Sequence, residues 1–123
     1  MTVIEAITRL DEMKPNGYGQ EDKIGWLSEL DGIIKSTVVD THAGGEKVSF
    51  EGYDGSTPLD TVLVVSSPYD SLYLDWMSAK IDFANGEFAR YNNSMTRYND
   101  TFLSFTREYN RTHMPIGVQI KYF

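Results

Sequence analysis

The chain has 123 residues, 41% of them hydrophobic and 24% charged, with a formal net charge of -7 and no cysteine. A chain of this length builds one hydrophobic core, and the composition is that of an ordinary globular domain, so we expect a single domain over residues 1–123. The acidic balance disfavours general affinity for nucleic acid, and the lack of cysteine excludes disulfides and thiolate-bound metals.

The first predicted helix is recognised by its N-terminal cap. Thr2 followed three residues later by Glu5 is a capping-box pattern, which starts a helix. The segment 15–19 contains one proline and two glycines, so the helix ends near Met13. Its apolar residues fall on one face: Val3, Ile7, Leu10 and Met13.

A second helix is predicted to begin near Gln20 or Glu21 and to continue to the glycine pair in segment 43–45. Gly25 and Gly32 each weaken it by about 1 kcal/mol relative to alanine, so tertiary packing must hold it. Its apolar residues recur at helical spacing: Ile24, Leu27, Leu30, Ile34 and Val38.

The next region has the pattern of β-structure. Val48 and Phe50 alternate with polar residues, segment 52–58 is typical of a loop, and segment 61–65 is rich in β-branched residues. We therefore expect a β-hairpin or two-stranded ribbon. A short C-terminal strand is also expected, either extending this ribbon or pairing with a neighbouring subunit. Its alternating residues are Val118, Ile120 and Tyr122.

Two further helices are predicted over residues 69–114. Pro68 precedes a third helix from about Tyr69, whose wide apolar face indicates a central position. Segment 85–86 interrupts it, and Glu87 opens a fourth helix. The expected fold is mainly α: a helical bundle of about four helices with a small β-hairpin or ribbon and a short C-terminal strand. The fourth helix carries an aromatic seam with alternating spacings of three and four: Phe88, Tyr91, Met95, Tyr98, Phe102, Phe105 and Tyr109.

The seam and the opposite side of the same helix each have two interpretations. The seam either packs in the core of the bundle or joins subunits. The roughly opposite side carries arginines, which are either solvated with ion pairs to Asp100 and Glu108 or face the acidic half of another subunit. Residues 1–68 hold twelve acidic and five basic residues, whereas residues 69–114 hold six and five. The candidate subunit-contact arginines are Arg90, Arg97, Arg107 and Arg111.

The sequence contains no recognisable catalytic, cofactor or metal motif, so we expect neither an enzyme nor a cofactor. His42 and His113 each fall at a predicted helix end, where capping is the simplest role. A shared catalytic or metal site would require both histidines to converge on carboxylates in a cleft.

Segment 63–115 resembles small proteins from the head-morphogenesis region of tailed phages and prophages of Gram-positive bacteria, the head-tail connector family, also called the head-completion or adaptor family. The resemblance covers a little under half of the chain. The elements that carry it are Pro68-Tyr69-Asp70, Asn85-Gly86-Glu87, Arg90-Tyr91-Asn92-Asn93, Tyr109-Asn110-Arg111 and His113-Met114-Pro115.

This resemblance implies a structural protein that forms a homo-oligomeric ring beneath the phage portal, extends the DNA channel and docks the tail. DNA would only pass through the ring, and an acidic lining would let it slide. We expect the protein in the host cytoplasm during assembly and then in the virion, without membrane contact. Candidate inter-subunit loop and strand residues are Gly52, Tyr53, Asp54, Gly55, Val118, Ile120 and Tyr122.

Two alternatives stay open at this point. The chain could be another head or tail morphogenesis protein, such as a tail-completion protein. It could also be a small non-enzymatic regulator that captures a partner with its aromatic helix, which predicts a stable monomer with an exposed aromatic patch.

Overall fold

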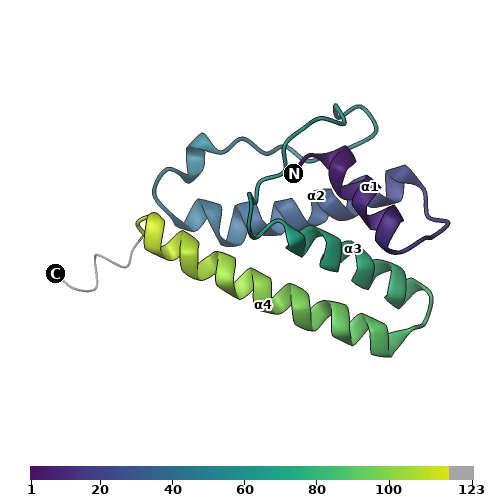
Figure 1. The fold of residues 1–123 in the computed structure, drawn as a ribbon. Coiled ribbons are helices and arrows are strands. Elements are labelled where there is room, and N and C mark those ends of the chain that lie inside the picture. The colour runs from purple at the N-terminus through teal and green to yellow at the C-terminus, as the bar shows by residue number, and fades with distance from the viewer. Residues whose placement is uncertain (117–123) are drawn as a thin grey trace.

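The computed structural model describes residues 1–116, which form a mainly helical bundle (Figure 1). The expected bundle of about four helices is confirmed. Helix α3 lies in the middle and contacts α1, α2 and α4, while α4 packs chiefly against α3. The elements are α1 (Val3–Met13), α2 (Gln20–Thr37), the short 3₁₀ helices η1 (Val39–Thr41) and η2 (Gly45–Lys47), α3 (Ser71–Ala84) and α4 (Phe88–Thr112).

The predicted capping box at the start of α1 is confirmed. The Thr2 backbone N–H donates to the Glu5 carboxylate at 3.1 Å, and the Glu5 backbone N–H donates to Thr2 Oγ1 at 3.2 Å. These bonds also lower the pKa of Glu5. The apolar face predicted for α1 is buried except for Met13, which is 57% exposed at the end of the helix.

Helix α2 ends earlier than predicted, at Thr37 and not at the glycine pair in segment 43–45. Thr37 Oγ1 donates to the Ile33 carbonyl at 2.6 Å, and the chain then tightens into η1. Side-chain hydroxyls that compete for helix carbonyls favour such an end. Val38 and Val39 therefore enter the core from a 3₁₀ turn.

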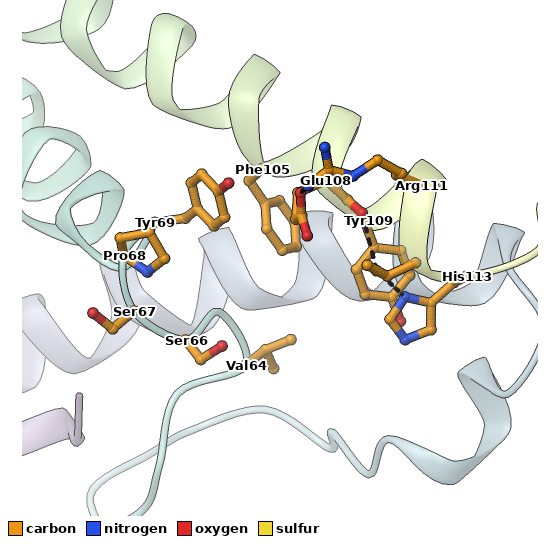
Figure 2. A pocket seen from close by; sticks show the side chains of 11 residues that line it. Val64, Ser66, Ser67, Pro68, Tyr69, Phe105, Glu108, Tyr109, Arg111 and His113 are labelled. Carbon is orange, nitrogen blue, oxygen red and sulfur yellow. Dashed lines mark hydrogen bonds and ion pairs between the residues drawn. The ribbon is translucent and has the colours of Figure 1, made fainter.

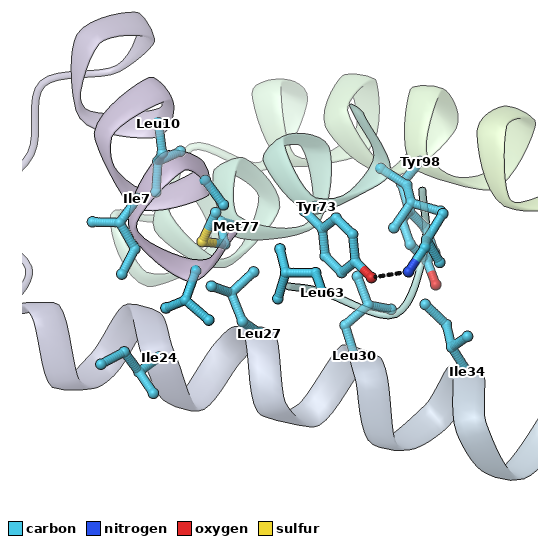
Figure 3. Packing of buried hydrophobic residues seen from close by; sticks show 14 of the residues in the cluster. Ile7, Leu10, Ile24, Leu27, Leu30, Ile34, Leu63, Tyr73, Met77 and Tyr98 are labelled. Carbon is cyan, nitrogen blue, oxygen red and sulfur yellow. Dashed lines mark hydrogen bonds between the residues drawn. The ribbon is translucent and has the colours of Figure 1, made fainter. Parts of the chain in front are cut away.

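The core lies where α1, α2 and α3 meet (Figure 3). Tyr73 of α3 points into its centre, and Leu63 enters it from the long connection that precedes α3. Burial of these side chains supplies the main stabilising free energy of the fold. The helical core residues labelled in the figure are Ile7, Leu10, Ile24, Leu27, Leu30, Ile34, Met77 and Tyr98.

The predicted β-hairpin over residues 48–65 is not present in the structure. Within residues 1–116, the only β-type pairs outside helices are the isolated antiparallel bridges Thr2–Val62 and His42–Pro115. The backbone N–H groups of Val64 and Val65 instead donate to side chains of the bundle. The segment is therefore extended, but it lies against α1, α2 and α3 and does not pair with a second strand. The predicted C-terminal strand, with Val118, Ile120 and Tyr122, lies outside the described residues.

A buried carboxyl group holds this extended segment to the bundle. Asp31 of α2 is fully buried and accepts hydrogen bonds from the hydroxyls of Tyr53 at 2.6 Å and Tyr73 at 2.5 Å, and from the Val64 N–H at 3.1 Å. Burial raises the pKa of Asp31, and these bonds partly oppose that shift. The loop, α2 and α3 therefore share one polar connection.

The turn between α3 and α4 follows the predicted break at residues 85–86. Gly86 has φ +73°, a left-handed conformation that favours glycine. The Gly86 N–H donates to the Phe83 carbonyl at 3.1 Å, and the Glu87 N–H donates to the Asp82 carbonyl at 2.8 Å. These bonds satisfy the last carbonyls of α3 and reverse the chain into α4.

Candidate functional site

A pocket lies between the last turns of α4 and the segment before α3 (Figure 2). Its volume is about 490 Å³. Ser66 and Ser67 lie on one side, and Glu108, Arg111 and His113 lie on the other. Glu108 and Arg111 form an ion pair with each other, and no hydrogen bond within residues 1–116 joins either serine to His113. The pocket is therefore a polar depression without a serine–histidine relay.

The two histidines lie on either side of Tyr109. The His113 ring stacks on Tyr109 with centroids 3.9 Å apart, and the His42 ring meets Tyr109 edge-on at 4.9 Å. His42 is buried, and its Nδ1–H donates to the Val38 carbonyl at 2.6 Å. This contact is the helix-end role predicted for His42. A further bond joins His42 Nε2 to the Asn110 side chain at 2.6 Å.

The histidines do not converge on carboxylates. No group of three or more potential metal ligands among His, Cys, Asp and Glu occurs in the described part of the chain. His113 is the C-cap residue of α4, as predicted: its backbone N–H donates to the Tyr109 carbonyl at 2.9 Å, while its ring bonds the Thr112 hydroxyl at 2.9 Å. The rings of His42 and His113 thus pack at the C-terminal end of α4. Across residues 1–116, no helix is both long and apolar enough to cross a membrane.

The four arginines of α4 form two groups and not one continuous face. Arg90 and Arg97 line a groove of about 440 Å³ together with Lys14 and the buried Asp82. Arg107 and Arg111 line a separate depression about three turns farther along α4. The first pair flanks the contact with α3, and Arg111 of the second pair also lines the pocket that holds the seam residues Phe105 and Tyr109.

The ion pairs of these arginines differ from those expected. Arg97 Nε pairs with Asp75 of α3 at 3.1 Å, and Arg90 pairs with Glu87 at 3.5 Å. Partial burial raises the pKa of Asp75, and the Arg97 charge opposes this shift. Arg111 pairs with Glu108, as expected for one of the two acids predicted. Within residues 1–116, Arg107 forms no ion pair.

The loop predicted as an inter-subunit element is attached to its own bundle at one point and exposed beyond it. The Tyr53 N–H donates to Ser28 Oγ at 3.0 Å, and Gly52 before it has φ +94°. Asp54 and Gly55 are exposed. The Asp54 carboxylate accepts hydrogen bonds from the Ser56 N–H and hydroxyl, which lower the pKa of Asp54. The loop tip is thus an ordered, acidic projection.

The aromatic seam is only partly buried. Tyr98 and Phe105 are 7% exposed, whereas Phe88 is 58% exposed. Burial raises the pKa of Tyr98 to about 12, so this residue stays neutral in the core. The middle of the seam therefore packs in the core of the bundle, as one of its two interpretations predicted. The first residue of the seam, at the start of α4, lies outside the core.

A hairpin groove between α3 and α4 was not predicted from the sequence. Its volume is about 270 Å³. Phe83 is 60% exposed and contacts the rings of Phe88 and Tyr91, with centroids 5.8 and 5.4 Å apart. One sequence feature could have indicated this groove: the apolar face of α3 is wider than the face that a central helix buries against its neighbours. The groove is lined by Trp76, Ala79, Lys80, Phe83, Tyr91 and Met95.

Fold and surfaces together define a mainly α protein with an aromatic helical hairpin at one edge and separated arginine pairs along its last helix. No protein-family model, no curated protein and no solved structure matches the chain.

Proposed function

We propose that this protein is a structural virion-assembly protein of a phage or prophage, a head-tail connector that forms a ring beneath the portal, extends the DNA channel and docks the tail. The observation that carries the proposal is the resemblance of segment 63–115 to connector proteins. That segment coincides with one structural unit, the α3–α4 hairpin and the chain that leads into it.

The surfaces of the hairpin support an assembly role. Phe83 and Phe88 are more than half exposed beside each other, and exposed apolar patches mark contacts between proteins. Arg107 and Arg111 are exposed on another side of α4. An acidic partner surface would complement these arginines, and residues 1–68 of a second copy provide an excess of acidic residues.

Charge reversal of the exposed arginine pair tests this role. The variant is Arg107→Glu with Arg111→Glu, and the matched control replaces both residues by lysine. We expect the glutamate variant to fold, because both residues are exposed, but to lose rings in electron microscopy and native mass spectrometry with portal protein present. The lysine control keeps the charge and should retain rings. A wild-type protein that forms no oligomer even with portal would refute the proposal.

The exposed groove also favours a second candidate, a non-enzymatic regulator that captures a partner with its aromatic surface. This candidate predicts a stable monomer. Another head or tail morphogenesis role, such as tail completion, predicts binding to a tail-terminator protein and not to portal. Terminase, portal and major capsid genes next to the coding gene would favour the phage roles over the regulator.

A further inference from the structure

The hairpin groove presents an anchor-like pattern of side chains. Trp76, Lys80 and Phe83 of α3 recur at helical spacing along its floor, and Tyr91 and Met95 of α4 form one wall. Lys80 lies 4.8 Å from the Trp76 ring and pairs with Glu29 of α2 at 2.6 Å. The groove is therefore apolar, with one charge held at its edge, which is the usual chemistry of a protein-binding groove.

A second and different apolar surface lies beside α1. Ile4, Leu59 and Val62 are 37%, 39% and 69% exposed. The Ile4 N–H donates to the Leu59 carbonyl at 2.9 Å, and Val62 forms the antiparallel bridge with Thr2, so the first turn of α1 lies beside the segment that holds Leu59 and Val62. We call this surface the α1 patch. Helix α3 lies between α1 and α4, which places the α1 patch and the outer helix of the hairpin on different sides of the molecule (Figure 1).

The two surfaces differ in charge. Exposed Glu5 and Asp60 are next to Ile4 and Leu59 in the sequence, and Glu5, Arg9 and Glu12 line one depression together with Ile4. In contrast, α3, α4 and the turn between them (residues 71–112) hold five acidic and five basic residues. Acidic residues outnumber basic ones around the α1 patch, so two patches would repel each other, whereas Lys80, the charged residue that lines the groove, would attract the patch. The favoured contact joins unlike surfaces.

We propose that the hairpin groove receives the α1 patch of a second copy of this chain. This inference rests on the proposed connector function and names the surfaces that join its subunits. Because the two surfaces differ, each contact leaves one free groove and one free patch. Such a heterologous contact propagates into a ring when its rotation closes.

Complementation between two blocked variants tests this pairing. Phe83→Glu places a charge in the groove, and Val62→Glu places one in the α1 patch. Both residues are exposed, so each variant should keep the circular dichroism spectrum of the wild type. Alone, each should lose oligomers in sedimentation velocity. Mixed, they should form a one-to-one dimer and nothing larger, since only one intact groove and one intact patch remain between them.

The matched control is Leu103→Glu, which adds a charge at an exposed apolar residue of α4 outside the groove. It should assemble as the wild type does. A mixture that stays monomeric, a blocked variant that assembles normally, or a wild type that stays monomeric at every concentration would overturn this pairing. The connector proposal is judged separately, by rings formed with portal protein, so rings that persist in both blocked variants would refute only the pairing.

Discussion

The buried hydroxyl of Tyr73 makes two interactions at once, and this allows a sharp test of the fold. It donates to Asp31 at 2.5 Å and accepts the Val65 N–H at 2.7 Å. Tyr73→Phe keeps the ring but removes both bonds. Losing a bond to a carboxylate costs about 1.5–3 kcal/mol, and leaving a buried N–H unpaired costs about 1–3 kcal/mol. We therefore expect the free energy of unfolding to fall by about 3 kcal/mol or more.

Urea denaturation followed by circular dichroism measures this change, and the slope against urea should stay the same because the surface exposed on unfolding is unchanged. The matched control is Tyr53→Phe. Tyr53 donates to the same carboxyl group at 2.6 Å but is only partly buried, and its hydroxyl accepts no backbone N–H. Its loss should cost about 1 kcal/mol. Equal effects of the two substitutions, or a change below about 0.5 kcal/mol for Tyr73→Phe, would refute the assigned role of the network.

Three further predictions concern stability. Burial raises the pKa of Asp31 above its ordinary value of 3.8, so protonation of this carboxyl group favours the folded state. The resulting stability should be lost as pH rises from 3.8 through the folded pKa, and unfolding titrations of Asp31→Asn should lack this pH-dependent loss. Thr2→Ala should cost about 1 kcal/mol in urea denaturation by removing the capping box, whereas exposed Thr8→Ala should be nearly neutral. In thermal denaturation, Gly86→Ala should destabilise by about 1 kcal/mol because of its positive φ, whereas Gly25→Ala in α2, where an added Cβ meets nothing within 4 Å, should stabilise by a similar amount.

The helices could be predicted because their signals are local. The Thr2 capping box and the break at residues 85–86 set boundaries that the structure reproduces. The start of α3 was placed two residues early, at Tyr69 and not at Ser71. Caps and glycine turns depend on neighbours within a few residues, so one sequence contains the information needed to place them.

The hairpin over residues 48–65 was predicted wrongly because its backbone partners are distant in sequence. β-Branched residues at 61–65 favour extended backbone, and extended backbone is what the structure shows. Whether an extended segment pairs with another strand depends on where its N–H groups find acceptors. Here Asp31 and Tyr73 provide these acceptors, and no periodicity connects them to Val64 or Val65.

The candidate site could be predicted only in part, because helical spacing gives a direction and not a neighbour. The four arginines of α4 do leave the seam, but the structure separates Arg90 and Arg97 from Arg107 and Arg111. Asp75, which pairs with Arg97, comes from α3. These groupings depend on how α3 packs against α4. The spacing of residues within α4 gives no information about that packing.

The exposed end of the aromatic seam is the end where α3 and α4 join, and not the end where α4 is longer than α3. The helices have 14 and 25 residues, so at about 1.5 Å per residue α4 extends roughly 16 Å beyond its partner. The chain before α3 and His42 cover the far end, where Tyr109 packs. At the end where α3 and α4 join, α3 stops at Ala84, and the rings of Phe83 and Phe88 stay more than half exposed. A regular seam of seven residues is therefore longer than the part that this bundle buries in its own core, and Phe88 at its start stays 58% exposed.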